Sequence, residues 1–267
     1  MLVRLFHSVV VIVFLFMLLP VFYVVLSSFN QSPSLAFPPP AYTLDWYLKI
    51  PEPFWHSLRL SVMVGVTTAA IATVLGTGIA IRIARSSSRW NPMFSALCLS
   101  PLMVPPLVVG AALMQFGIIM WDLVGTNPTG NMPAVIAGHV ALTLPFVIRS
   151  VMAAHAHHDS SMEEAALNLG ATPIQVLFKV TLPALMPGIT SGAIFAFLLS
   201  LDDVAIALFV GSGDEQTLPV KILTILDYSF SPYIMAISAI MVYGSIVLLL
   251  IIHRLLGLEK IFGFGRG

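Results

Sequence analysis

Six long apolar runs restrict what this 267-residue chain can fold into. About 20 apolar residues cross a bilayer as a helix, and in lipid a helix satisfies its own backbone hydrogen bonds. The runs cover residues 5–26, 58–81, 93–120, 132–152, 188–210 and 232–256. We therefore expect an all-α integral membrane protein with six spans in a single transmembrane domain over residues 1–267.

The composition agrees with this expectation. Hydrophobic residues make up 58% of the chain and charged residues only 9%, with a mean hydropathy of +0.97, whereas soluble proteins carry roughly 25% charged residues. The formal net charge of zero indicates no nucleic-acid partner. The run Leu5–Leu26 is longer than a signal-peptide core and has no small-residue cleavage site after it. We expect it to remain as the first span.

The basic residues predict the orientation. Placing the N-terminus in the cytoplasm puts nine of the twelve Lys and Arg residues on or near the cytoplasmic side. These are Arg4, Arg82, Arg85, Arg89, Arg149, Lys179, Arg254, Lys260 and Arg266, against Lys49, Arg59 and Lys221 outside. Cytoplasmic loops carry the excess of positive charge, so we expect both termini in the cytoplasm.

A polar segment, Ser161–Pro187, interrupts the apolar pattern between the fourth and fifth runs. Ser161 and Glu164 have the spacing of a capping box, which predicts a short helix from about Met162. Glu163 and Glu164 also suit the positive end of a helix dipole.

The same segment predicts a sharp turn and a second helix. Gly170 can adopt the left-handed conformation that ends a helix. Thr172 and Gln175 form a second capping box around a first-turn proline. We expect Pro183 and Pro187 to separate this second helix from the fifth span.

The segment 164–183 resembles a loop of a known family of membrane proteins. Glu164-Ala165-Ala166, Gly170 and Val180–Pro183 match, in register, the cytoplasmic EAA loop of permease subunits of bacterial ABC importers, with Val180 where isoleucine is usual. The resemblance implies the type I ABC importer permease fold, with a coupling helix in a loop at about 154–187 that docks on an ATPase subunit. The coupling residues that it implies are Glu163, Glu164, Ala165, Ala166, Gly170 and Pro183.

The resemblance also implies partners. They are a second homologous permease, two ATP-binding subunits and a periplasmic substrate-binding protein, assembled in the bacterial inner membrane. The chain has no G-x-x-x-x-G-K-[ST] phosphate loop. We therefore expect ATP and magnesium to be bound by the ATPase subunits, with no cofactor and no catalytic residue in this chain.

Asp202 and Asp203 lie inside the fifth run, roughly 20 Å from its inner end. Charged groups at such depth are costly and indicate a functional site that faces a cavity or a partner. Carboxylates there would stabilise a cation such as a primary ammonium group. The alternative is structural: one aspartate caps a break in the helix or pairs with a partner subunit.

Further residues of a substrate path are expected in the first half of the chain. Trp46 lies in the sequence TLDWY, which resembles polyamine permeases with an aromatic residue near the path, although an interfacial anchor is the alternative. Asp122 ends the third run at the outer surface, where it could equally be a solvated loop residue. The prolines of this run predict either a broken helix beside the path or a kinked packing helix. They are Pro101, Pro105 and Pro106.

The C-terminal part resembles the second permease of spermidine/putrescine transporters. SLDDVAIALFVGSG at 200–213, TLPVKI at 217–222 and FSP at 230–232 carry the likeness. Tyr233, Met235 and Asp227 depart from that pattern, where a glutamate, an asparagine and a basic residue are expected. The resemblance implies a polyamine substrate, and the alternatives are an opine, another amino acid derivative or an aminophosphonate.

The histidines suggest two other functions, a membrane metal enzyme and a proton-coupled transporter. In the cluster 155–159, which also contains His157, His155 and His158 share a helix face, and these two imidazoles with a carboxylate such as Asp159 could hold a divalent ion, as a membrane metal enzyme requires. They lie at a helix end, where histidines also bind backbone carbonyls, and we expect no metal site. A proton-coupled secondary transporter could use His139 with the two aspartates, but we expect His139 to be a hydrogen-bonded packing residue.

Overall fold

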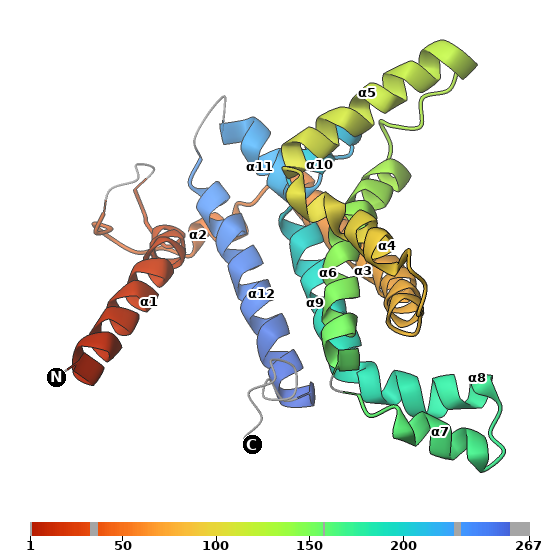
Figure 1. Cartoon of the computed structure of the whole chain (residues 1–267). Helices are drawn as coiled ribbons and strands as arrows, with labels where there is room; N and C mark the ends of the chain where they lie inside the picture. The colour runs from red at the N-terminus through yellow and green to blue at the C-terminus, as the bar shows by residue number, and fades with distance from the viewer. Residues whose placement is uncertain (1, 33–36, 157, 227–230, 257–267) are drawn as a thin grey trace. The chain divides into compact units, whose positions relative to one another are not determined.

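The computed structural model describes residues 2–32, 37–156, 158–226 and 231–256. The regular secondary structure of this part is helical apart from an isolated β-bridge between Asn30 and Tyr42, and loops join the helices (Figure 1). Six of its helices are long and apolar enough to cross a membrane. The expectation of an all-α protein with six spans is confirmed.

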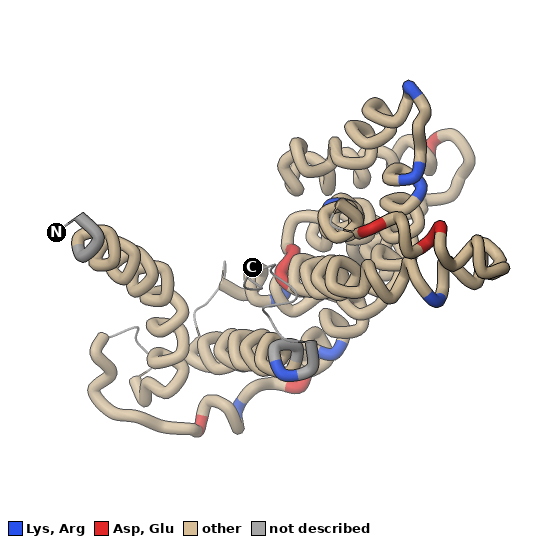
Figure 2. The backbone as a smooth tube through the Cα atoms, turned by 60° about the horizontal axis from the view of Figure 1, so that its bottom comes forward, with Lys and Arg blue, Asp and Glu red and all other residues tan. Residues whose placement is uncertain are grey.

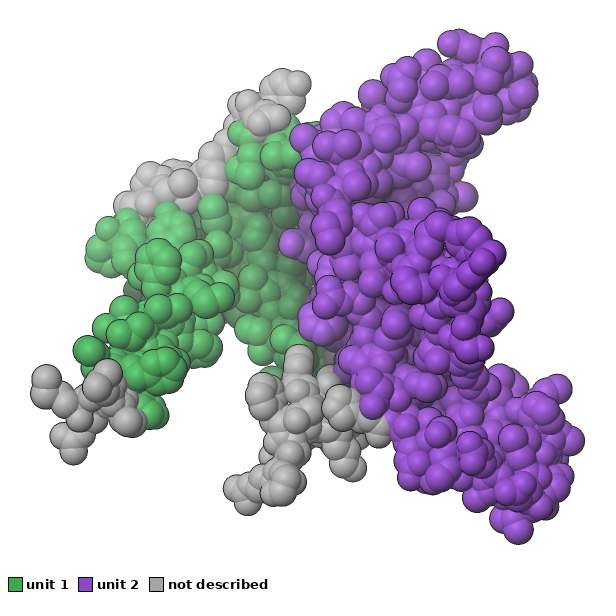
Figure 3. All heavy atoms as spheres, in the orientation of Figure 1, with its two compact units in different colours: residues 1–56, 221–251 green, residues 57–220, 252–267 purple. Residues whose placement is uncertain are grey.

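The helices group into two compact units, residues 1–56 with 221–251 and residues 57–220 with 252–267 (Figure 3). In chain order the elements are α1 (Leu2–Ser27), α2 (Asp45–Leu48), α3 (Glu52–Ala84), α4 (Asn91–Leu99), the 3-10 helix η1 (Ser100–Met103), α5 (Pro106–Val124), α6 (Met132–Ala156), α7 (Ser161–Asn168), α8 (Pro173–Val176), the π-helix η2 (Leu177–Thr181), α9 (Leu182–Asp202), α10 (Ala205–Val210), α11 (Leu218–Leu226) and α12 (Tyr233–Leu256). A single domain over the whole chain stays a prediction.

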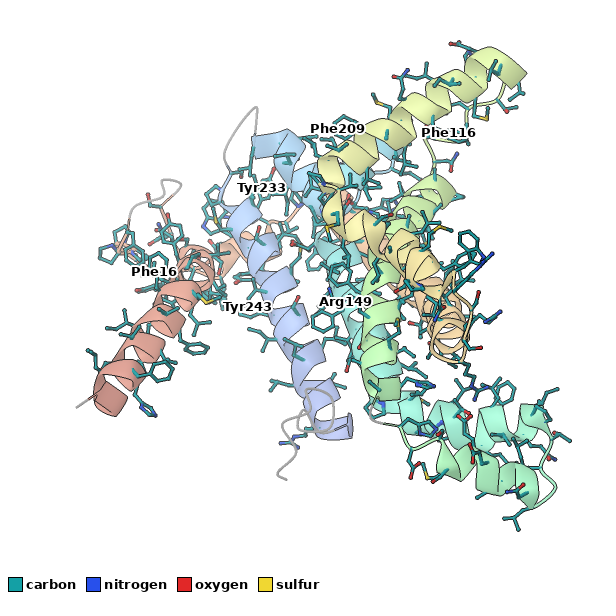
Figure 4. All side chains as sticks on the ribbon, viewed as in Figure 1. Phe16, Phe116, Arg149, Phe209, Tyr233 and Tyr243 are labelled. Carbon is teal, nitrogen blue, oxygen red and sulfur yellow. The ribbon has the colours of Figure 1, made fainter. Side chains whose placement is uncertain are left out.

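The first unit contains α1, which exposes large apolar side chains such as Phe16 (Figure 4) and Met17. Lipid or another membrane helix can cover such a surface, because no water reaches it in a bilayer. In the same unit the Ser28 and Tyr47 hydroxyls lie 2.7 Å apart. Burial raises the pKa of Tyr47 to about 12, although the hydrogen bond with Ser28 opposes the shift.

The second unit is built around α6 and α9, which pack along their lengths. Val147 and Ile148 of α6 and Leu185 of α9 are fully buried between them. Gly188 makes the close approach possible, because a Cβ there would lie 2.6 Å from the Ala154 Cβ and from the Ser150 carbonyl oxygen. Small residues allow membrane helices to pack in this way.

Four predicted spans lie inside, or within one residue of, the helices α1, α3, α6 and α12. The third predicted span, 93–120, is wrong as a single helix. It is divided into α4, η1 and α5, because Pro101 and Pro105 interrupt the hydrogen-bond ladder. The helix is therefore broken, and its place beside a substrate path stays a prediction.

The fifth predicted span, 188–210, also has the wrong limits. Pro183 and Pro187 do not separate it from the preceding helix, since Pro173–Asp202 forms one continuous helical segment. Pro183 stands in the first turn of α9, directly after the π-helical turn, where its missing N–H costs little. At the other end α9 stops at Asp202, and α10 follows as a separate helix.

Candidate functional site

Two groups of candidate residues lie at opposite ends of the second unit. The helices α7 and α8 project from one end of α6 and α9, and α5 leaves from the other end (Figure 1). Charged residues are sparse along the helices between these ends (Figure 2). We call the segment 161–176 the elbow.

The start of the elbow differs from the prediction. The helix α7 begins at Ser161, but the capping box of Ser161 and Glu164 is wrong, because Ser160 is the N-cap residue and makes no side-chain cap bond. Instead the Ser161 backbone N–H donates to Asp159 Oδ1 at 2.9 Å. An aspartate readily accepts from the backbone two residues ahead. This backbone hydrogen bond holds the pKa of Asp159 below its usual value.

The turn and the second helix follow the prediction. Gly170 has φ +87°, a conformation that residues with a Cβ rarely adopt. The Thr172 N–H donates to Gln175 Oε1 at 2.8 Å, and the Gln175 N–H donates to Thr172 Oγ1 at 3.3 Å. Both bonds of the second capping box are present, so this prediction is confirmed.

Glu163 has a role that its sequence context did not reveal. Its Oε2 accepts a hydrogen bond from Arg85 Nη2 at 2.7 Å, and its Oε1 accepts from Thr181 Oγ1 at 2.7 Å. His158 Nε2 lies 3.2 Å from the same Oε1, and Arg85 also donates to Thr181 Oγ1 at 2.8 Å. These residues tie the elbow to the end of α3 and to η2, and we call them the Glu163 clamp.

The clamp controls the charge of Glu163. Partial burial favours the neutral carboxyl, but the hydrogen bonds from Thr181 and Arg85 and the Arg85 charge outweigh it and lower the pKa of Glu163. Glu163 is therefore an anchor inside the chain, whereas Glu164 is exposed. The ring of His158 also contacts that of His155, and His157 lies outside the described residues.

The elbow exposes large apolar side chains. Leu169 is 88% exposed and Ile174 70%, and Phe178 in η2, directly after the elbow, is 64% exposed. The helical segment 173–202 contains 30 residues and is about 45 Å long, which is longer than the hydrocarbon core of about 30 Å. Exposed apolar patches of this kind mark protein-binding surfaces. Ala165 and Pro183 are exposed as well, and Ala166 is half-buried.

At the other end, Asp202 and Asp203 line one cavity of about 430 Å³. Pro101 and Pro106 from the broken third run and Phe146 from α6 also line it. We call this cavity the acidic pocket. The break in the third run therefore lies beside the two aspartates, and all other side chains around the cavity are apolar.

Asp203 holds the break between α9 and α10. Its Oδ1 accepts the N–H groups of Ile206 at 2.9 Å and Ala207 at 3.2 Å. His139 Nε2 lies 3.2 Å from the same oxygen without the alignment of a hydrogen bond, while its Nδ1 is hydrogen-bonded to Ser200 Oγ at 2.7 Å. The alternative that one aspartate caps a helix break is confirmed for Asp203, as is the packing role of His139.

Asp202 is in a different position. It ends α9, is exposed in the acidic pocket, and makes no hydrogen bond or ion pair with any other described residue. Because the caps occupy one oxygen of Asp203, Asp202 is the carboxylate with more capacity to bind a cationic group. The structure thus separates two neighbouring residues that the sequence treated alike.

The other two candidate residues are Asp122 and Trp46. Asp122 is exposed in the last turn of α5, roughly 24 Å along the helix from Pro106. Trp46 belongs to the first unit, where its Nε1 donates to the Asn30 carbonyl at 2.8 Å and Lys49 Nζ lies 5.3 Å from its ring. A place on the substrate path stays a prediction for both.

Sequence comparisons give a consistent result. Residues 72–258 match the family described as binding-protein-dependent transport system inner membrane component. The putrescine transport system permease protein PotI of Escherichia coli is 30% identical over 230 residues, covering 85% of this chain and 82% of that protein. The spermidine/putrescine permease protein PotC of the same organism is 27% identical over 253 residues, covering 94% and 93%. The molybdenum permease protein ModB of Mycobacterium bovis is 34% identical over 200 residues, covering 68% and 74%.

Solved structures support the fold. An ABC transporter that imports the polysaccharide alginate superposes with a TM-score of 0.67 at 17% identity, covering 95% of this chain and 97% of that one. The MetNI methionine ABC transporter gives 0.58 at 19% identity, covering 84% and 100%. The matched family covers more than half of the sequence, so this chain belongs to the inner membrane components of binding-protein-dependent transport systems, as a multi-pass, non-catalytic permease of an ABC importer.

Proposed function

We propose that this chain forms part of the path by which an ABC importer carries a polyamine, or a related small cation with amino groups, into the cytoplasm. The observation that carries the proposal is the acidic pocket, where Asp202 has no partner among the described residues. A carboxylate in such a place binds an ammonium group by charge-assisted hydrogen bonds.

The lining of the acidic pocket favours a cation over an oxyanion. Two carboxylates and otherwise apolar side chains surround the cavity. A molybdate ion, the kind of cargo that the name of the ModB relative suggests, would be repelled and would find no cationic side chain there. The methylene groups of a polyamine could instead pack against side chains such as Leu142 and Phe146. The names of the PotI and PotC relatives agree with this substrate class.

The elbow would receive the energy for transport. Its exposed apolar side chains form a surface for an ATPase subunit, and Glu164, Ala165, Ala166 and Gly170 lie on or beside that surface. The Glu163 clamp joins this surface to α3 and η2, so a displacement of the elbow would reach the spans as a rigid movement. ATP and magnesium would be bound by two ATPase subunits, and a second permease and a periplasmic binding protein would complete the transporter. In this arrangement both termini lie in the cytoplasm.

Uptake by the complete transporter tests the proposal. The chain is co-expressed with its partner permease, ATPase and binding protein, and the complex is reconstituted in proteoliposomes with ATP inside or outside as its orientation requires. We expect ATP-dependent uptake of radiolabelled putrescine or spermidine and none of molybdate. Molybdate uptake without polyamine uptake would overturn the substrate class, and polyamine uptake that needs no ATP would overturn the coupling.

A further inference from the structure

A second cavity, of about 460 Å³, lies where the end of α3 meets α4. It is lined by Gly78, Ile79, Arg82, Ile83, Ser86, Ser88, Asn91, Phe94 and Cys98. None of these residues lines the acidic pocket. One wall is apolar and comes from the two helices, and the rim is polar and comes mainly from the connection between them.

The rim is ordered and carries an unused positive charge. Asn91 Nδ2 donates to the carbonyls of Ile83 at 2.7 Å and Ser86 at 3.2 Å, which fixes the connection across the helix end. Arg82 is exposed and makes no hydrogen bond or ion pair with another described residue, whereas Arg85 is held by Glu163. No acidic side chain lines the cavity. An anionic group at the rim would therefore be attracted by Arg82.

Neighbouring residues place this rim at the level of a membrane surface. Trp90 is 50% exposed and Arg89 lies over its ring at 5.3 Å. Exposed tryptophan and arginine side chains at the end of a span are typical of the headgroup region. The apolar wall, with Ile79 and Phe94, continues into the span.

We propose that this cavity binds an anionic phospholipid from the surrounding leaflet, with an acyl chain against the apolar wall and the headgroup phosphate at Arg82. Basic pockets between membrane helices bind anionic headgroups in this way. The site lies one helical turn before Arg85, so a bound lipid would restrain the end of α3 that holds the elbow. Lipid composition would then influence coupling.

Cys98 makes the proposal testable, because it lines the cavity and is the only cysteine in the chain. The complete transporter is placed in nanodiscs of phosphatidylcholine, with or without phosphatidylglycerol, and the rate at which N-ethylmaleimide modifies Cys98 is measured by mass spectrometry of this subunit. We expect phosphatidylglycerol to slow the modification roughly fivefold, a factor typical of one basic side chain at an anionic surface.

Two variants and a control assign the effect. Arg82→Gln removes the charge at the rim and should abolish the protection by phosphatidylglycerol. Gly78→Leu should slow the modification in both kinds of nanodisc, because a Cβ at Gly78 meets nothing within 4 Å and the new side chain can enter the cavity. Arg254→Gln changes an exposed arginine of α12 that does not line the cavity, and should leave the protection intact.

Several results would overturn the proposal. Equal modification rates with and without phosphatidylglycerol, or protection that persists in Arg82→Gln, would exclude an anionic lipid held by Arg82. Protection by soluble glycerol phosphate in phosphatidylcholine nanodiscs would identify a site for a free anion instead. A Cys98 that fails to react even without phosphatidylglycerol would mean that another subunit covers the cavity.

Discussion

The carboxylates of the elbow and of the acidic pocket differ in their hydrogen-bonding partners. Glu163 in the elbow has Arg85, Thr181 and His158 around it. Asp202 in the acidic pocket has no hydrogen-bonding or ion-pairing partner among the described residues. A carboxylate with several partners fixes one arrangement of the chain, whereas a carboxylate without them can bind a ligand. In the proposed function, the end with the partnered carboxylate would transmit force and the end with the unpartnered one would contact substrate.

The helix breaks at the two ends also differ. At the elbow α7 ends in a turn through Gly170, which has a positive φ, and the Thr172–Gln175 capping box then begins α8. At the acidic pocket the break is held by Asp203, which accepts two backbone N–H groups. The end of α7 depends on the backbone conformation of Gly170, whereas the start of α10 depends on the Asp203 side chain, so substitutions at Gly170 and Asp203 should have different effects.

The largest effect is expected from Gly170→Val. A β-branched residue at φ +87° is strained by about 1–3 kcal/mol, which should shift the turn and lower uptake by roughly tenfold or more. The measurement is ATP-dependent uptake in proteoliposomes at equal amounts of reconstituted protein. The matched control is Gly125→Val, which imposes similar strain at φ +69° at the end of α5, where a Cβ also has open space. Equal losses in the two variants would show that the elbow has no special role.

Asp202→Asn should have the next largest effect. Loss of a charge-assisted hydrogen bond costs about 1.5–3 kcal/mol, so the substrate concentration for half-maximal uptake should rise roughly 10- to 100-fold. Asp203→Asn should transport almost normally, because asparagine caps a helix about as well as aspartate. Asp203→Ala, which removes the cap, should lower stability by about 1 kcal/mol. Equal uptake kinetics in the two asparagine variants would contradict the proposal that Asp202 binds substrate and Asp203 only caps α10.

Local patterns allowed much of this architecture to be predicted. Apolar runs located the spans, and the turn chemistry of Gly170, Thr172 and Gln175 located the elbow, because each signal lies within a few residues. The Glu163 clamp could not be found in this way. Arg85 is 78 residues away from Glu163 in sequence, and no spacing rule joins them.

The predictions that were wrong also depended on neighbouring groups that the sequence does not give. Asp159 accepts the Ser161 N–H, and the Glu164 N–H donates to the Ser160 carbonyl, so the predicted bond from Glu164 to the Ser161 hydroxyl is not formed. Pro101 lies where the third run is broken, whereas Pro187 lies inside the continuous helix α9. In a membrane the neighbouring helices decide whether the freed backbone groups are satisfied. Sequence alone does not give those neighbours, and it did not separate Asp202 from Asp203 either.

Glu163→Gln should have a moderate effect. It removes the charge that Arg85 binds, and a half-exposed ion pair contributes about 1 kcal/mol or less. We expect hydrogen exchange in residues 161–176 of the complete transporter to accelerate by a factor of roughly five or less, and the ATP hydrolysed per substrate imported to rise. Glu164→Gln is the matched control: its side chain is exposed, so exchange in the elbow should not change. Faster exchange in the Glu164 variant alone would reverse the assignment of anchor and contact residue.

The smallest effect is the pH dependence of the Glu163 clamp. The pKa of Glu163 lies below its ordinary value of 4.5, chiefly because the hydrogen bonds from Thr181 and Arg85 outweigh the opposing effect of burial. A lowered pKa in the folded chain means that the stabilisation is complete above pH 4.5 and is lost as the pH falls through the folded value. The difference in melting temperature between the wild type and Glu163→Gln should therefore stay constant from about pH 6 to 8 and decrease only in acid. A difference that changes between about pH 6 and 8 would show that a group other than the Glu163 carboxyl controls the clamp, and the elbow would then be sensitive to protons in the range where the cell works.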